Sequence, residues 1–467
     1  MHEINKYMNI DNDIKLAINQ CKKYKKGRIF SYTFKYKIND LLPMLSINKD
    51  DGNFRVYWNQ NSPNIELVGI NQACSINMEN CDNIIDFNNK IETVLETMIS
   101  IPDNIDIFPK FIGGHAFSFE SNKTNIWGNF PRGKYVLPEC VATVTDEGSW
   151  ITISKKINYK DNYVAISKSF KNIFDKCRKL LDIKLPRVKY HELIDITDFP
   201  VKNDYINSIA SVIKNIKSHK VKKVVMSRYK RAYIKQDLCE VSILQTLCSS
   251  YPDCTNYFFS FPNEGIFFGS TPERLLNKNK KILITEALAG TMKRGATENE
   301  DCLFEKKLSG SEKNQDEHQF VIDEIISKLA PKSKLICVSN HPEVVKLKNV
   351  QHLKSIIKTE VKNDISLLEL VDILHPTPAV AGTPIQSALD YINKNETYDR
   401  GWYSGPIGWL DSNGNGDIFV GLRSSLYKNN YIYMFSGSGI VSQSSPEEEW
   451  EETEMKLQPI LTALCGE

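Results

Sequence analysis

Arginine is scarce in this chain of 467 residues: only 11 of the 59 basic residues are Arg, and the rest are Lys. Asp and Glu together number 57, so the net charge at pH 7 is only +2. Neither sign of charge predominates, and this excludes the strong overall field with which proteins attract nucleic acid or an anionic membrane. The position of each Arg is therefore informative, because a guanidinium in a confined site indicates a bound anion.

Long hydrophobic runs and paired cysteines are missing as well. No stretch of 18 apolar residues occurs, so no transmembrane helix is expected. Residues 1–20 lack the apolar core of a signal peptide. The 11 cysteines include no CxxC pair, which is typical neither of a zinc site nor of a disulfide framework. We expect reduced thiols, a cytoplasmic location, and no nucleic-acid or membrane partner.

The apolar pattern predicts a mixture of helices and hairpin strands. Helices are expected at 204–217, at 311–329 and from Ser445, which forms a capping box with Glu448. Strands are expected at 53–58, 151–157, 221–226, 258–261, 266–269, 282–285, 407–410, 418–425 and 431–436. Because helices and strands do not alternate steadily, an α+β architecture with antiparallel sheets is favoured over a doubly wound sheet. A boundary is expected near 198–201, where the sequence becomes richer in motifs.

Two of these helices carry oxygen-bearing side chains on one face. Glu449, Glu452 and Lys456 share a face of the last helix, and Asn314 and Glu317 have the same spacing in the earlier helix. Two such helices could together hold one hard cation such as Mg²⁺, which takes carboxylates and keeps several waters. The simpler alternative is that the acidic first turn of the last helix is solvated and complements the helix dipole.

Five arginines lie in compact motifs with Gly, Pro or Ser, namely Arg228, Arg274, Arg294, Arg400 and Arg423. Arg423 lies in the predicted strand 418–425, where a buried guanidinium would need an anion. Arg228, Arg274 and Arg400 are interpreted as members of structural ion pairs.

A lysine and a glycine-rich run complete the candidate features. Lys223 begins an apolar strand, where burial would lower its pKa and allow it to act as a base. Lys is so common here that this position alone carries little weight. The run SGSGI at 436–440, expected just after a strand, would let backbone amides approach an anion. Most such runs are only turns.

Taken together, nine motifs in order resemble the chorismate-utilising enzymes, which include isochorismate, salicylate, anthranilate and aminodeoxychorismate synthases. The motifs lie within about residues 204–463 and read KVVMSR, FFGSTPERLL, EALAGTMKRG, EKNQDEH, HPTPAVAGTP, YDRGWYSGPIGW, FVGLRSS, SGSGIV and SPEEEWEET. The resemblance implies one large α+β unit, with two antiparallel sheets flanked by helices. Residues 1–195 would be the variable N-terminal part of that fold, and 204–463 the chorismate-binding catalytic region.

Within the family, the motifs are most similar to those of the isochorismate synthases. Relatives that add ammonia carry Gln where this chain has Lys223, and they differ around Ala379. No glutamine amidotransferase segment is recognised, so no such subunit is expected as a partner. The resemblance implies an isomerase that supplies isochorismate to menaquinone or catechol siderophore synthesis. Two alternatives stay open: a salicylate synthase, which also eliminates pyruvate, and a non-catalytic relative.

The implied reaction is the attack of water on C2 of chorismate, a shift of the double bonds and departure of the C4 hydroxyl. By motif position, Lys223 is the general base that activates water, and Glu273 is the general acid that protonates the leaving hydroxyl. An acid that works near neutral pH needs a raised pKa, which burial could supply.

The resemblance also implies a metal site. Glu317 and Glu452 match ligands of a Mg²⁺ ion that binds the ring carboxylate of chorismate, and Glu449 and Asn314 match their water-mediated partners. The family often has an acidic residue where this chain has Asn314, so metal binding here is expected to be somewhat weaker.

The substrate contacts follow from the resemblance in the same way. Arg423 and Tyr403 match a clamp on the enolpyruvyl carboxylate, and His352 matches a histidine near the ring. His341 and His375 are expected to be structural. The remaining wall of the pocket is expected to comprise Gly290, Thr291, Ala379, Gly437, Gly439 and Lys456.

Overall fold

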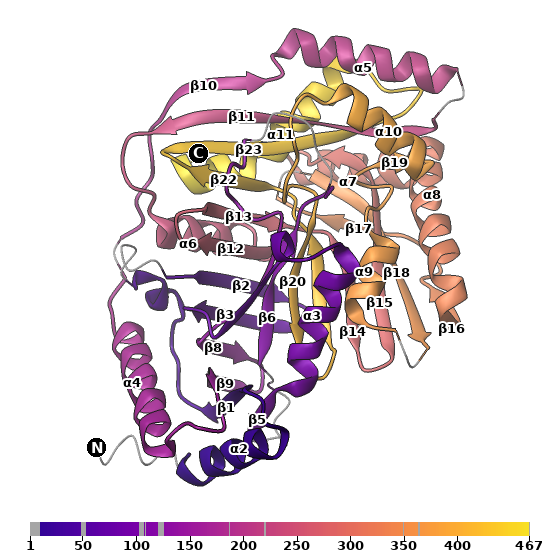
Figure 1. The fold of residues 1–467 in the computed structure, drawn as a ribbon. Coiled ribbons are helices and arrows are strands. Elements are labelled where there is room, and N and C mark those ends of the chain that lie inside the picture. The colour runs from indigo at the N-terminus through magenta and orange to yellow at the C-terminus, as the bar shows by residue number, and fades with distance from the viewer. Residues whose placement is uncertain are drawn as a thin grey trace.

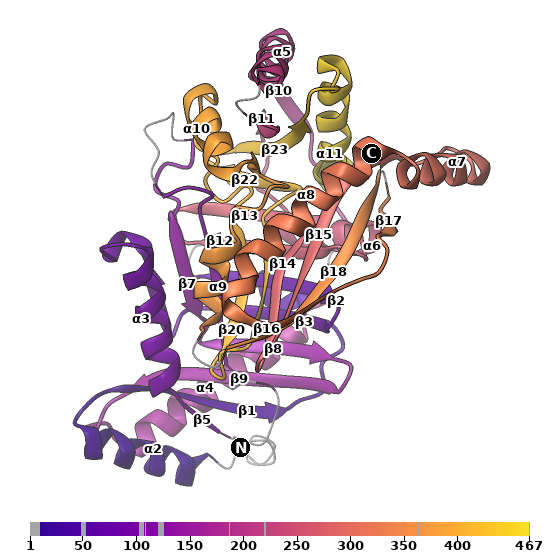
Figure 2. The ribbon, with the colours of Figure 1, turned by 90° about the vertical axis from the view of Figure 1, so that its right-hand side faces the viewer.

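The computed structural model describes residues 10–47, 53–101, 107, 109–119, 126–185, 187–218, 221–348, 350–362 and 365–466. In this part of the chain, two large sheets are flanked by helices, and the longer sheet is seen from top to bottom of Figure 1. Figure 2 shows the second sheet and the helices that cover its outer face. The α+β prediction, with two large sheets flanked by helices, is confirmed.

The first sheet has 13 strands. Strands β1 and β5 are parallel, whereas pairs such as β1 with β9 and β11 with β23 are antiparallel. The order across the sheet is β10 (Leu193–Phe199), β11 (Lys223–Ile234), β23 (Tyr431–Ile440), β22 (Ser424–Lys428), β13 (Gly265–Thr271), β12 (Thr255–Phe261), β2 (Arg55–Asn61), β3 (Asn64–Ile70), β8 (Cys140–Thr145), β9 (Gly148–Ile157), β1 (Arg28–Lys35) and β5 (Ile99–Ile101), with β19 (Gly382–Thr383) against β11.

The second sheet has 10 strands. Their order is β16 (Ser333–Val338), β18 (Val350–Val361), β15 (Ile282–Lys293), β14 (Arg274–Asn279), β21 (Gly416–Val420), β20 (Pro406–Asp411), β6 (Lys110–His115), β7 (Gly133–Leu137) and β4 (Cys74–Asn77), with β17 (Glu343–Lys346) against β18.

Several helices have amphipathic sequences and bury their apolar residues in the hydrophobic cores. Helix α8 packs against β15, and α11 packs against β23. No helix within the described ranges is long and apolar enough to cross a membrane. The helices are α2 (Asp11–Tyr24), α3 (Ile84–Thr97), α4 (Tyr163–Leu181), α5 (Lys202–Lys217), α6 (Glu240–Ser250), α7 (Glu298–Ser309), α8 (Glu312–Leu329), α9 (Leu367–Leu374), α10 (Ile385–Asn395) and α11 (Pro446–Cys465), with short 3₁₀ helices at Leu42–Ser46, Met78–Asn80 and Ala330–Lys332.

Strands from the two ends of the chain are interleaved in both sheets. In the first sheet, β12 pairs with β2, so that Phe258 lies opposite Tyr57. In the second, β20 pairs with β6, so that Trp409 lies opposite Ile112. Residues before the expected boundary therefore supply strands beside those that follow it.

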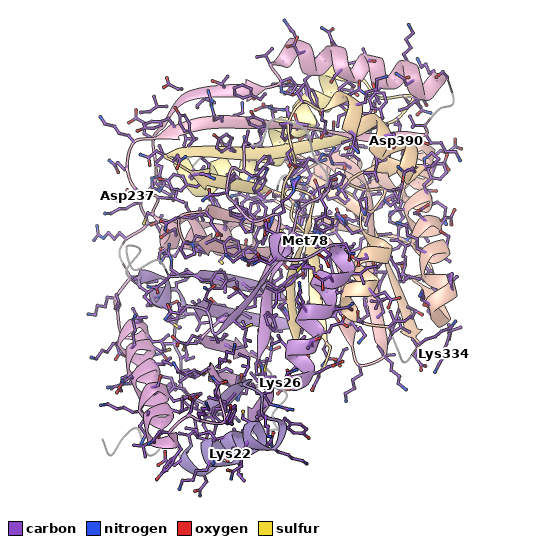
Figure 3. The ribbon with its side chains drawn as sticks, viewed as in Figure 1. Lys22, Lys26, Met78, Asp237, Lys334 and Asp390 are labelled. Atoms are coloured by element: carbon purple, nitrogen blue, oxygen red, sulfur yellow. The ribbon has the colours of Figure 1, made fainter. Side chains whose placement is uncertain are left out.

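An aromatic core fills the space between the sheets. Trp58 of β2 and Phe419 of β21 contact edge to face, with ring centroids 5.6 Å apart. Trp402 is fully buried in the same cluster. Some charged side chains, such as Lys22 and Lys334, lie on the outside of the molecule (Figure 3). Burial of these large rings is the main stabilising contribution that joins the sheets.

Three local predictions near the C-terminus are wrong. The expected strand 418–425 is two strands in different sheets, β21 and β22, and the chain crosses between the sheets at 421–423. The apolar pattern does not mark this change of sheet, because all of β21 and the first three residues of β22 are buried, and no exposed residue separates the two strands. The run 436–440 lies inside β23 rather than after it, and the Ser445 side chain makes no capping hydrogen bond.

Candidate active site

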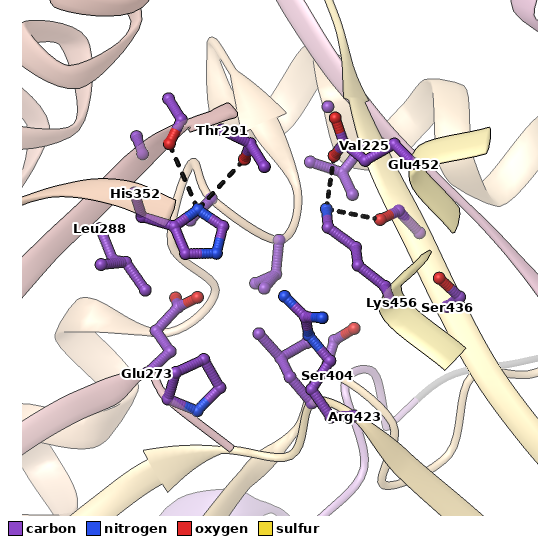
Figure 4. A pocket seen from close by; sticks show the side chains of 18 of the residues that line it. Val225, Glu273, Leu288, Thr291, His352, Ser404, Arg423, Ser436, Glu452 and Lys456 are labelled. Atoms are coloured by element: carbon purple, nitrogen blue, oxygen red, sulfur yellow. Dashed lines mark hydrogen bonds and ion pairs between the residues drawn. The ribbon is translucent and has the colours of Figure 1, made fainter. Parts of the chain in front are cut away.

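A single pocket brings together every residue that the sequence predicts for the site. Its wall is formed by β11 and β23 of the first sheet, β15 and β18 of the second, the first two turns of α8, the first three turns of α11, and four connecting segments. Figure 4 shows Glu273, His352 and Arg423 converging on a common space. The predicted residues on this wall are Lys223, Glu273, Gly290, Thr291, Asn314, Glu317, His352, Ala379, Tyr403, Arg423, Gly437, Gly439, Glu449, Glu452 and Lys456.

Lys223 is the first residue of β11, and its amino group is buried in the pocket. Its side chain is only 7% exposed, and Nζ donates a hydrogen bond to Glu317 Oε1 over 2.7 Å. A Cβ on Gly439 would lie 2.7 Å from Lys223 Cε, so this glycine leaves room for the lysine. The neighbouring Lys222 is exposed and lies over the ring of Phe320. Burial thus distinguishes Lys223 from the many other lysines.

Glu273 follows β13, and its carboxyl group has little contact with other polar atoms. Thr377 donates a long hydrogen bond of 3.5 Å to Oε1, and Val420 N donates to the backbone carbonyl. Burial raises the pKa of Glu273 to about 7, despite the opposing effect of Lys223 and Lys456. A carboxyl group with this pKa is partly protonated at neutral pH and can donate a proton.

Arg423 lies at the crossing between the sheets, in a left-handed backbone conformation with φ of 48°. Its side chain is buried, yet its guanidinium group has no hydrogen bond or ion pair with any described residue. By contrast, Arg274 pairs with Glu286 and Asp417, and Arg294 with Asp301. A buried cation without a partner is costly, so Arg423 is poised to receive an anion from the pocket.

Tyr403 and two glycines of β23 form the wall beside Arg423. The ring of Tyr403 stacks on Phe435, with centroids 5.3 Å apart. A Cβ on Gly437 would lie 2.9 Å from the Tyr403 hydroxyl, so the close approach requires glycine here. Lys456 donates to the Gly437 carbonyl over 3.0 Å and to Glu452 over 2.6 Å.

His352 of β18 has one ring nitrogen held by β15 and the other free. Nδ1 lies 3.2 Å from the carbonyl of Gly290 and 3.1 Å from the Thr291 hydroxyl. The carbonyl can only accept, so Nδ1 carries the proton. Burial, with the nearby Arg423 and Lys456, lowers the pKa of His352 to about 3. The neutral ring therefore presents Nε2 as an acceptor without a described partner.

The four candidate metal ligands lie on the same pocket wall but are not gathered into one cluster. Within the described ranges, no group of three His, Cys, Asp or Glu side chains is close enough to hold a metal ion. Glu317 is paired with Lys223, and Glu452 with Lys456. The donor set of carboxylate and amide oxygens on α8 and α11 nonetheless fits the chemistry of Mg²⁺.

The structure adds pocket residues that the sequence reasoning missed. Ser404, with φ of 62°, lies next to Tyr403 in the motif YDRGWYSGPIGW. Its place in that motif was the only feature of the sequence that could have indicated its presence in the pocket. Leu288, Val380 and Phe435 supply apolar surface, which no local pattern marks as functional. His375 donates to the Ser404 carbonyl and so supports the wall from outside.

Comparison with known proteins identifies the family of the chain. The family described as "Chorismate binding enzyme" matches residues 16–465, nearly the whole chain. The chain belongs to this family. This chorismate-binding enzyme is 29% identical over 465 residues to isochorismate synthase MenF of Bacillus subtilis. The aligned residues cover 97% of this chain and 96% of the relative. It is also 36% identical over 258 residues to the salicylate biosynthesis isochorismate synthase of Pseudomonas aeruginosa, covering 55% and 54% of the two chains.

Solved structures show the same fold. The structure of MenF, the menaquinone-specific isochorismate synthase from Escherichia coli, superposes with a TM-score of 0.77 at 23% identity, covering 97% of this chain and 99% of that one. Anthranilate synthase component I from Streptococcus pneumoniae superposes with a TM-score of 0.71 at 20% identity, covering 84% and 91%. The chorismate-binding enzymes thus share this pair of sheets across different reactions.

Proposed function

We propose that this chain is an isochorismate synthase, an isomerase that converts chorismate to isochorismate. One observation carries the proposal: a buried lysine, a buried carboxyl group with a raised pKa and an arginine that pairs with no described residue line the same pocket. These groups correspond to a base, an acid and an anion receptor. The relative from Bacillus subtilis, which matches along nearly the full length, bears the same name.

The reaction is an allylic displacement that needs a proton removed at one end and supplied at the other. Lys223 takes a proton from water, whose oxygen forms a bond to C2 of the ring. The double bonds shift, and the bond between C4 and its hydroxyl breaks. Glu273 protonates this hydroxyl as it leaves. One water enters and one leaves, so substrate and product are isomers.

Arg423 orients the substrate through its enolpyruvyl carboxylate, with Tyr403 beside it. A guanidinium group can bind both carboxylate oxygens at once, which fixes the direction of the ring as well as its position. Because no described residue pairs with the Arg423 guanidinium group, the substrate carboxylate binds to it without first breaking an ion pair inside the protein. The acceptor Nε2 of His352 faces the same space and suits a substrate hydroxyl.

A Mg²⁺ ion is proposed as the cofactor. Glu317 and Glu452 would hold it directly, and Glu449 and Asn314 through water, and it would neutralise the ring carboxylate. The support is the oxygen donor set on α8 and α11, which lines the same pocket as Lys223 and Glu273.

Identification of the product tests the proposal. The purified chain is incubated with chorismate and Mg²⁺, and the products are separated and identified by mass spectrometry. Isochorismate without pyruvate is expected. Stoichiometric pyruvate would instead indicate a salicylate synthase, and intact chorismate would indicate a non-catalytic relative.

The product is proposed to serve menaquinone or catechol siderophore synthesis. Among the relatives, one is named for vibriobactin and another for salicylate biosynthesis. Deletion of the gene, followed by measurement of menaquinone and of secreted catechols, separates these routes. Loss of neither compound would contradict both.

A further inference from the structure

The strand that carries Lys223 has an incomplete edge just where it borders the pocket. One edge of β11 pairs with β23, so that Val225 lies opposite Gly439 and Ser227 opposite Gly437. On the other edge, β19 covers Lys223 and Val224, and β10 begins only at Tyr229. Between them no described strand covers the backbone, which would leave buried polar groups unsatisfied.

A buried ion pair fills this gap in place of a strand. Glu396 Oε1 accepts hydrogen bonds from Ser227 N and Ser227 Oγ, both 2.8 Å long. Arg400 Nη2 donates to the carbonyl of Val225 over 2.8 Å. The two side chains pair with each other through Nε and Nη2 of Arg400, and each is only 2% exposed. Together they supply the acceptor and the donor that a neighbouring backbone would supply.

The same arginine reaches two further parts of the pocket wall. Arg400 Nη1 donates to the carbonyl of Val380 over 2.8 Å, which holds the segment that carries Ala379. The backbone carbonyl of Arg400 accepts from Tyr403 N, at the start of the turn that presents Tyr403. The guanidinium group thus ties together two wall segments that are distant in the sequence, and the backbone of the same residue holds a third.

We propose that Glu396 and Arg400 are positioning residues, which set the backbone of β11 and thereby the place of Lys223 in the pocket. Neither side chain lies on the pocket wall, so they act through Lys223 and its neighbours rather than on the substrate. A replacement of Arg400 by Lys cannot reproduce this role, because an ammonium group lacks the fixed fork that bonds to Glu396, Val225 and Val380 together. The effect on catalysis rests on the proposed function, whereas the effect on β11 does not.

The first test replaces the whole pair by apolar side chains, as Glu396→Met/Arg400→Met. Replacing both members of the pair leaves no unpaired buried charge, so this variant is expected to fold, although the backbone groups of Val225 and Ser227 lose their partners and the free energy of unfolding falls. We expect kcat with chorismate to fall by about 10- to 100-fold, because small displacements of reacting groups are costly. KM is expected to change by less than about threefold, since the Arg423 clamp is untouched.

The matched control is another deeply buried pair, Arg55 with Glu240, whose side chains are 4% and 5% exposed and which does not line the pocket. Arg55→Met/Glu240→Met should leave kcat unchanged. A loss of kcat equal to that of the Glu396 and Arg400 variant would show a general effect of buried charge and overturn the proposal. Unchanged kcat in the Glu396 and Arg400 variant would overturn it as well.

The second test needs neither turnover nor a folded double variant. Amide hydrogen exchange is measured on the wild-type chain, where Ser227 N should be protected as strongly as Val225 N, which donates to the Ala381 carbonyl. In Arg400→Lys, protection of Ser227 should fall. Rapid exchange of Ser227 in the wild-type chain would overturn the proposal, even if the enzyme makes isochorismate. Strong protection in a chain that does not convert chorismate would uphold the positioning of β11 and reject the function alone.

Discussion

Glu273 owes its chemical character to its surroundings rather than to its sequence motif. Its carboxyl group is buried beside two lysines that favour its charged form, and burial still has the larger effect on its pKa. A glutamate in the same motif on a surface would be ionised at neutral pH. The acid role is therefore a property of this residue in this pocket.

The pH dependence of turnover follows from that pKa. Burial raises the pKa of Glu273 to about 7, and the protonated form that donates the proton predominates below it. As the pH rises through this value, kcat should fall, by about tenfold per pH unit well above it.

Glu273→Gln, which folds but cannot donate a proton, should lower kcat by roughly 100- to 10,000-fold and abolish the fall of kcat at high pH. A wild-type kcat that keeps rising above the pKa, or a near-normal kcat in the variant, would reject Glu273 as the acid.

Lys223 and Lys222 are adjacent, but only one faces the pocket. Lys223→Gln should abolish water addition, with kcat reduced by roughly 100-fold or more, while Mg²⁺-dependent chorismate binding persists. Lys222→Gln serves as the control, because that side chain is exposed and lies off the pocket wall. Turnover by stopped assay and binding by calorimetry are measured for both variants. Retained activity in Lys223→Gln would place the base elsewhere.

At the scale of the elements, helices α8 and α11 each present two oxygen-bearing residues to the pocket. Arg228, buried in β11, donates to Thr453 Oγ1 over 2.7 Å and pairs with Glu454, so it attaches α11 to the strand that carries Lys223. This contact places the Glu449 and Glu452 face of the helix over the pocket. Arg228 is thus a member of a structural ion pair, as its motif predicts.

The metal response is the prediction that belongs to α11. Glu452→Ala should abolish the Mg²⁺ response, because it removes one proposed direct ligand. Mg²⁺ binding by calorimetry in the absence of chorismate, together with the Mg²⁺ dependence of kcat, provides the measurement. Glu451→Ala is the control, since Glu451 is 66% exposed and pairs only loosely with Lys202 at 3.6 Å. An unchanged Mg²⁺ titration in Glu452→Ala would refute its role as a ligand.

For the whole molecule, the interleaving of strands decides whether the catalytic region can stand alone. Strand β12 depends on β2, and β20 depends on β6, for backbone pairing and for the aromatic core between the sheets. A chain that lacks residues 1–195 would expose both strand edges and large apolar rings.

We therefore expect the truncated chain 196–467 to aggregate or to unfold without cooperativity, whereas the full chain gives one cooperative transition. Size-exclusion chromatography, dye binding and thermal melts compare the two. A monomeric truncated chain with a sharp transition would show that 204–463 is an independent domain, contrary to this expectation.

Many elements were predictable because their signals are local. The helix predicted at 311–329 was found within one residue of α8, and the strands predicted at 258–261 and 266–269 lie inside β12 and β13. The strand expected at 418–425 failed, since the change of sheet at 421–423 depends on which neighbours pair with each half. Ser404, Val380 and Phe435 were missed, because small and apolar residues line a pocket without any signature of their own.

The sequence by itself determined the family resemblance, the identity of the candidate residues and the helical faces that carry Asn314 with Glu317 and Glu449 with Glu452. These depend on residue types and on short spacings, which the chain carries in any context. Only the tertiary structure decided that these faces and Lys223 meet in one pocket, that Glu273 has a raised pKa and that Arg423 has no partner among the described residues. Desolvation and pairing are properties of contacts between distant residues, so they exist only once both sheets have formed.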